Sequence, residues 1–122
     1  LHRDRLALRD GRSGQRSPIH DHRGSICGVR VLSGSAIETL FEQTKDGWIY
    51  ATGSHELGRN QVCGSEDSDI HQISNLCPQG EDLVTLHVYS PALLVMGTYS
   101  LTGNTRGEFT DPVHVFSDGA GI

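Results

Sequence analysis

Short apolar runs recur along most of this chain, and their rhythm restricts its fold more than any other feature. From Ile26 onward, runs rich in Val, Ile, Leu and Thr are separated by turn residues at roughly ten-residue spacing. Such a rhythm is typical of an all-β domain. We therefore expect strands at 19–23, 26–32, 36–43, 48–52, 54–57, 70–75, 83–89 and 93–100.

The segments between and around these runs suggest how the chain is organised. Ser33-Gly34-Ser35 and Lys45-Asp46-Gly47 predict hairpin turns, because glycine tolerates positive φ. Residues 58–69 are polar and are expected to form a loop. A length of 122 residues suits one domain with one core. We expect a poorly defined, arginine-rich arm at 1–13, the β domain at 14–100, and a C-terminal tail packed on it at 101–122.

Charge and cysteine content narrow the range of partners and compartments. The formal net charge of −5 argues against a basic surface for nucleic acid and favours a small-molecule partner. Three cysteines, Cys27, Cys63 and Cys77, cannot all pair within one chain, which suggests a reducing compartment. Neither a secretory leader nor a membrane span of about 18 apolar residues is evident. We expect a cytoplasmic monomer.

Two histidines one residue apart are the clearest candidates for metal ligands. Side chains alternate along a strand, so His20 and His22 should point to the same face and could reach one metal ion. Asp21 should point to the opposite face, where a hydrogen bond to a turn or a second strand is expected instead of ligation. A pair of surface histidines without metal is the alternative.

The histidine pair lies within a longer frame of glycine and cysteine. Gly14, His20, His22, Cys27 and Gly34 follow the spacing G-x5-H-x-H-x4-C-x6-G. This spacing resembles the first motif of the cupin superfamily, with cysteine at the position where a glutamate ligand is usual. The resemblance implies a jelly-roll barrel.

His71 is the third candidate ligand. With Asn75 it resembles the H-x3-N end of the second cupin motif, although Glu66 and Ser68 occupy the places of its Pro-x-Gly portion. Together with the histidine pair, His71 would give a metal three neutral ligands and no carboxylate. A zinc site formed by His71 with two of the cysteines is a weaker alternative, since the spacing matches no compact zinc motif.

Four longer segments make the resemblance more specific. They are Ser17–Cys27 (SPIHDHRGSIC), Leu40–Glu42 (LFE), Asp69–Asn75 (DIHQISN) and Leu86–Pro91 (LHVYSP). Together they resemble the cysteine dioxygenase family, the iron-dependent thiol dioxygenases of the cupin superfamily. The resemblance covers roughly residues 13–100. Because full-length members have helices before the H-x-H segment, we expect that helical region to be lacking here.

The resemblance implies a set of site residues and a reaction. His20, His22 and His71 would bind Fe(II), Cys27 and Tyr89 would form a thioether, and His87 would support the tyrosine hydroxyl, with Thr85 beside it. L-Cysteine and O2 would give cysteine sulfinic acid. The alternatives are a dioxygenase for another small thiol, such as 3-mercaptopropionate, and a non-catalytic cupin that binds a metal.

The group that binds the substrate carboxylate is left open. Family members use an arginine that precedes the H-x-H segment, and Arg3 lies in a segment that only faintly resembles theirs. A guanidinium is suited to this task because it offers two parallel hydrogen bonds. Arg23 is expected on the opposite face, as a solvated side chain, whereas Arg30, Arg59 and Arg106 remain possible. His55 and His114 are expected at the surface.

Overall fold

Ten strands and no helix make up the regular structure of the computed structural model, which describes residues 5–11, 14–66, 68–76 and 81–110. No helix able to cross a membrane is found in these ranges. The strands are β1 (Arg5–Gly11), β2 (Ile19–His20), β3 (Ile26–Ser33), β4 (Ala36–Gln43), β5 (Ile49–Leu57), β6 (Val62–Ser65), β7 (Ile70–Ser74), β8 (Leu83–Ser90), β9 (Val95–Tyr99) and β10 (Gly107–Thr110).

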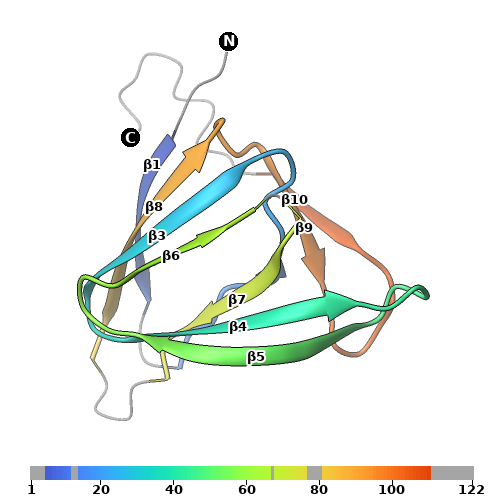
Figure 1. Ribbon diagram of the computed structural model, residues 1–122, viewed down its shortest axis with the longest axis horizontal. Coiled ribbons are helices and arrows are strands. Elements are labelled where there is room, and N and C mark those ends of the chain that lie inside the picture. The colour runs from blue at the N-terminus through green and yellow to red at the C-terminus, as the bar shows by residue number, and fades with distance from the viewer. Residues whose placement is uncertain (1–4, 12–13, 67, 77–80, 111–122) are drawn as a thin grey trace.

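The strands form two antiparallel sheets that enclose the interior. The four-stranded sheet has the order β1-β8-β3-β6, and the six-stranded sheet has the order β10-β9-β2-β7-β4-β5. In Figure 1 the four-stranded sheet follows one side of a triangular outline, β4 and β5 follow the lower side, and β9 and β10 close the third. This arrangement confirms the expected all-β, cupin-type barrel.

The core follows from the alternation that the sequence shows. Along β3, Cys27, Val29 and Val31 are buried while the residues between them are more exposed. The described residues form three buried hydrophobic clusters: Cys27, Val29, Tyr89 and Leu93; Val31, Ala36, Leu57, Ile73 and Leu83; and Ile19, Phe41, Ile49 and Ile70. Truncating a side chain as deeply buried as Leu93 costs about 2–5 kcal/mol in typical cores. The strands that surround the interior are therefore held together by ordinary hydrophobic burial.

Of the two predicted hairpin turns, only Lys45-Asp46-Gly47 joins paired strands, β4 and β5, whereas the turn at Gly34 carries the chain from the four-stranded sheet to the six-stranded sheet. Gly34 has φ of 80° and Gly47 has φ of 91°, in the region that favours glycine. At Gly34, an added Cβ would lie 2.5 Å from the backbone oxygen of Asp82. A side chain there would push the β3–β4 turn away from the segment that leads into β8.

Several elements differ from the sequence expectations, mostly at sheet edges. β5 is one continuous strand instead of two, and β6 lies within the expected loop 58–69. β1 and β10 occupy parts of the expected arm and tail, while residues 111–122 lie outside the described residues. β5, β6, β1 and β10 are the outermost strands of the two sheets, held by backbone pairing with one neighbour. Such pairing requires no alternating apolar pattern, so the sequence rhythm does not reveal β1, β6 and β10, and it reveals β5 only as two shorter strands.

Candidate metal centre

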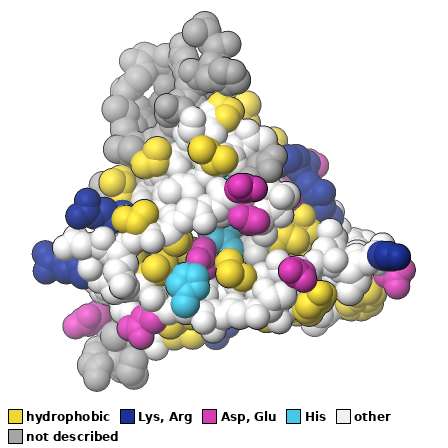
Figure 2. All heavy atoms as spheres, in the orientation of Figure 1, with side chains coloured by type: hydrophobic (Ala, Val, Ile, Leu, Met, Phe, Trp, Pro, Cys, Tyr) yellow, Lys and Arg dark blue, Asp and Glu magenta, His cyan; other side chains and the backbone are white. Residues whose placement is uncertain are grey.

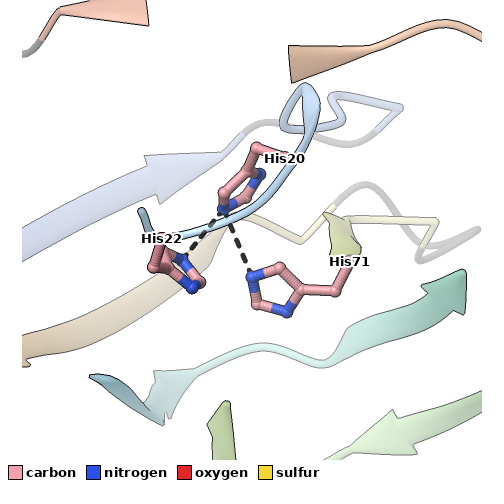
Figure 3. Close-up of side chains that lie close together, drawn as sticks. All are labelled: His20, His22 and His71. Atoms are coloured by element: carbon pink, nitrogen blue, oxygen red, sulfur yellow. Dashed lines mark hydrogen bonds between the residues drawn. The ribbon is translucent and has the colours of Figure 1, made fainter. Parts of the chain in front are cut away.

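Three buried histidines converge in the interior, as the sequence predicted. His20 ends β2 and lies directly opposite His71 of β7, and His22 follows two residues later. The strand ends earlier than expected, yet the Asp21 amide donates to the Gly97 oxygen at 3.0 Å and prolongs the pairing with β9. His20 Nε2 lies 3.1 Å from His22 Nε2 and 3.2 Å from His71 Nε2 (Figure 3).

The outer ring nitrogen of each histidine has its own partner. His20 Nδ1 donates to the Pro18 carbonyl oxygen at 2.7 Å, and His71 Nδ1 donates to Glu38 Oε2 at 2.8 Å. His22 Nδ1 lies 3.2 Å from Ser65 Oγ. A carbonyl or carboxylate oxygen only accepts, so these contacts place the protons of His20 and His71 on Nδ1. Their Nε2 lone pairs are left facing the interior.

The converging nitrogens suit a metal ion. Burial, followed by the charges of His20, His71 and His87, lowers the pKa of His22 to about 3 in total. The ring of His22 is therefore neutral near pH 7. The ligand atoms of the three histidines all lie within 4.8 Å of one another. With metal–nitrogen bonds of about 2.1 Å at right angles, nitrogens lie about 3.0 Å apart. Ring nitrogens at this spacing could all reach one metal ion, and imidazoles are suitable ligands for iron.

Glu38 is a site residue that sequence reasoning missed. It belongs to β4, its side chain is buried, and its two carboxylate oxygens contact His71 and His55. Burial works to raise the pKa of Glu38, but the hydrogen bond and charge of His71, with smaller contributions from Cys63 and His55, outweigh it and lower the pKa. The available signal was a charged residue two positions after Ala36, on the side of the strand expected to face the core.

A row of polar side chains on β8 faces the histidines from the other sheet. Thr85 Oγ1 lies 2.9 Å from His87 Nε2, and His87 Nδ1 lies 3.3 Å from the Tyr89 hydroxyl. The Tyr89 ring lies 5.8 Å from that of His22, between centroids. The predicted alternation of Thr85, His87 and Tyr89 on one face is thus correct.

Cys27 lies directly opposite Tyr89 on β3, and both are buried in the same cluster. Cys27 is a free thiol here, so the expected thioether is not formed in this structure. Burial, followed by the charge of Glu38, raises the pKa of Cys27 to about 12. Near pH 7 the group is therefore a neutral thiol and not an anionic ligand.

A cavity of about 450 Å³ opens beside the histidines and the β8 row. Arg16 supplies the only guanidinium among the described residues that line it. The backbone of Arg16 forms a β-bridge with Ser74. The backbone N–H of the next residue, Ser17, donates to the Ile73 oxygen at 2.8 Å and fixes the same segment. Arg16 was not among our sequence candidates, although it lies only four residues before His20. The lining residues are Gln15, Arg16, Ser17, Pro18, His20, Ile73, Asn75, Leu83, Thr85, His87, Tyr89, Met96 and Phe109.

The arginines considered from the sequence lie elsewhere. Arg23 pairs with Glu108 at 2.6 Å, and Arg106 lies 3.5 Å from Asp21. Arg30 contacts Asn60 at 3.3 Å. Neither these three nor the exposed Arg59 line the cavity. Arg3 lies outside the described residues.

The remaining candidates have structural partners or lie outside the described part of the chain. Asp21 accepts hydrogen bonds from the Gly97 amide at 2.8 Å and the Tyr99 hydroxyl at 2.7 Å, which confirms a role on a second strand. Cys63 contacts Glu38 at 3.5 Å, and the histidine cluster found among the described residues contains no cysteine. Cys77 and His114 lie outside those residues.

Comparisons with known proteins agree with this arrangement. Residues 9–102 match the family model described as Cysteine dioxygenase type I. The chain is 36% identical over 81 residues to proteins named Cysteine dioxygenase type 1 from Rattus norvegicus and Homo sapiens, covering 64% of this chain and 40% of each relative. It therefore spans well under half the length of these relatives.

Solved structures support the fold. A cupin domain from Schizosaccharomyces pombe has a TM-score of 0.60 at 11% identity, covering 74% of this chain and 54% of its own. A Cupin 2 conserved barrel domain protein from Salinispora arenicola has a TM-score of 0.55 at 15% identity, covering 70% of this chain and 61% of its own.

Proposed function

The chain belongs to the cysteine dioxygenase type I family, and on this premise we propose that it is an iron-dependent thiol dioxygenase that oxidises L-cysteine with O2 to cysteine sulfinic acid. The observation that carries the proposal is the convergence of three buried imidazoles beside a cysteine and a tyrosine on paired strands. Such a site offers nitrogen ligands on one side and a phenol on the other.

His20, His22 and His71 would hold Fe(II), which supplies the redox chemistry needed to activate O2. Because all three ligands are neutral, the centre keeps a full dipositive charge. That charge favours the thiolate form of a substrate and lowers the effective pKa of its thiol. The neutral Cys27 thiol fits this role, since an anionic ligand there would remove part of the charge.

Tyr89 would orient the reacting groups by hydrogen bonding through its hydroxyl. His87 holds that hydroxyl and Thr85 holds His87, so the phenol is preorganised before substrate binds. We propose that Cys27 Sγ also bonds to the Tyr89 ring during turnover. This step removes the thiol hydrogen and one ring hydrogen. The two protons and two electrons that are released pass to O2.

Arg16 would bind the substrate carboxylate. A guanidinium lining the cavity beside His20 and Tyr89 supports this assignment, because it can donate two parallel hydrogen bonds to a carboxylate. We expect Arg16→Gln to raise KM for cysteine about tenfold, in line with the loss of one charged hydrogen-bond pair. Turnover of cysteamine, which lacks the carboxylate, should change little. Equal effects on both thiols would rule out this role.

Iron loading under anaerobic conditions, followed by oxygen uptake with cysteine, tests the function directly. We expect one iron per chain and cysteine sulfinic acid detected by mass spectrometry. Bound iron without oxygen uptake would instead indicate a non-catalytic cupin. Turnover restricted to 3-mercaptopropionate would overturn the choice of substrate. Cytoplasmic location and a monomeric state stay predictions.

A further inference from the structure

A surface histidine is linked to the metal centre through a buried carboxylate. His55 of β5 lies directly opposite Glu38 of β4, and its Nε2 is 3.0 Å from Glu38 Oε1. The other carboxylate oxygen, Oε2, is 2.8 Å from His71 Nδ1. Each oxygen of Glu38 therefore contacts a different histidine, one of which is a proposed metal ligand.

The exposure of these three side chains changes steeply along the link. The side chain of His71 is 2% exposed and that of Glu38 is 4% exposed, whereas that of His55 is 46% exposed. Histidine side chains reach the face drawn in Figure 2, with acidic side chains beside them. A carboxylate removed from water must be satisfied by protein donors, because a buried unpaired charge is costly. His55 supplies a donor to Oε1, and Oε2 also receives the Cys63 thiol at 3.5 Å.

We propose that His55 is a positioning residue for the metal centre. The hydrogen bond from His55 to Oε1 fixes the rotamer of Glu38. Oε2 therefore continues to accept the hydrogen bond from His71 Nδ1–H. That bond keeps the Nε2 lone pair of His71 directed at the metal and strengthens it as a donor. The inference depends on the metal-binding part of the proposed function but not on the reaction with thiols.

The test compares three variants at exposed positions of β5. His55→Leu removes the donor, and His55→Gln keeps an N–H that can reach Glu38. Tyr50→Phe is the matched control, because Tyr50 lies opposite Glu42 on the same two strands and donates to its carboxylate at 2.9 Å, outside the metal centre. All three should fold, since both positions face solvent.

Three readouts separate positioning from general stability. We expect His55→Leu to weaken Co(II) binding about tenfold, which is at the lower end of the losses seen when a group that holds a metal ligand is removed. The visible spectrum of the cobalt-loaded protein should also shift. His55→Gln and Tyr50→Phe should stay within about threefold of the original affinity. In metal-free protein, imidazole nitrogen-15 shifts should show the Nδ1–H form of His71 in the original chain and a mixture in His55→Leu.

Unchanged affinity and spectrum in His55→Leu would overturn the proposal while leaving the proposed function intact. Equal weakening in His55→Leu and His55→Gln would also overturn it, because a hydrogen-bond donor would then make no difference. If the unsubstituted protein bound no metal, both this proposal and the proposed function would fail. Metal binding without thiol oxidation would remove only the dioxygenase assignment.

Discussion

The two sheets that face each other across the interior supply different kinds of chemistry. The six-stranded sheet, with the segment that follows β2, carries His20, His22 and His71. The four-stranded sheet carries Thr85, His87 and Tyr89 on β8 and the cysteine on β3. On the first sheet the outer nitrogens of His20 and His71 contact oxygens that only accept, whereas on the second sheet the polar groups contact one another.

The two sheets therefore suit two different tasks in the proposed reaction, metal binding and orientation of the substrate. Imidazoles held at Nδ1 by a carbonyl and a carboxylate have one defined lone pair each, which is what a metal ligand requires. Hydroxyl and imidazole groups in a row can both donate and accept, which suits orientation of substrate and movement of protons. Substitutions on the two sheets should therefore fail in different ways.

The largest effect is expected from a ligand on the six-stranded side. His22→Ala should weaken metal binding by more than about 100-fold and abolish oxygen uptake, because it removes a nitrogen donor directly. Metal content after dialysis and oxygen consumption measure the two effects. Ser65→Ala removes only the partner of His22 Nδ1, so it should weaken metal binding by no more than about tenfold and keep oxygen uptake. Full metal content in His22→Ala would mean that the comparison between the sheets is wrong.

A substitution on the four-stranded side should preserve the metal. Tyr89→Phe keeps the buried ring but removes the hydroxyl held by His87, so kcat should fall about 100-fold while metal content is unchanged. Mass spectrometry of peptides tests the thioether in the same experiment. The peptides of Cys27 and Tyr89 should be recovered joined, two hydrogens lighter than their sum, after turnover of the original chain. Metal loss in Tyr89→Phe would contradict the division between sheets.

The histidine side was the easier part to predict from the sequence. His20, His22 and His71 stand in a motif with fixed spacing, and alternation in a strand explains why the first two share a face. The row on β8 followed from the same alternation. The shared faces were predicted correctly because alternation is a local periodicity that the order of residues determines directly, whereas the place of His71 beside the pair followed from its resemblance to the cupin motif.

Glu38, Arg16 and His55 illustrate what could not be predicted. Their contacts depend on which strands become neighbours: β4 lies between β7 and β5, so Glu38 meets one histidine from each. Arg16 reaches the cavity because its segment pairs with the end of β7. Strand β1 was also missed, since backbone pairing with β8 leaves little trace in composition. Long-range pairing was therefore the missing information.

A third prediction concerns the stability of the six-stranded side. Asp21→Asn should lower the free energy of unfolding by about 2–3 kcal/mol, because the asparagine side chain has one oxygen and its NH2 group cannot accept, so either the Gly97 N–H or the Tyr99 hydroxyl loses its acceptor. Urea unfolding of the metal-free protein measures this loss. Arg106→Gln, which removes an exposed partner of Asp21, should cost under about 1 kcal/mol. Similar losses in both variants would contradict a role for the buried hydrogen bonds.

The smallest expected effect is a decrease in the free energy of unfolding at alkaline pH, caused by the ionisation of Tyr99. Burial, then the hydrogen bond to Asp21, raises the pKa of Tyr99 from 10.0 to about 12. Between these values the folded chain keeps a proton that the unfolded chain has lost, so stability falls as pH rises through this window. Tyr99→Phe should show a shallower fall between pH 10 and pH 12, measured by urea unfolding. Identical slopes would remove Tyr99 as a contributor.

The position of β8 within its sheet has a consequence for how this protein can tolerate insertions. β8 pairs with β1 on one side and β3 on the other, with Tyr89 opposite both Arg5 and Cys27. A single residue added or deleted among Thr85, His87 and Tyr89 would turn the side chains on one side of the change outward, and pairing with two neighbouring strands opposes such a slip. Length variation during evolution should therefore collect in the turns before and after β8, whereas the strand itself should change only by substitution.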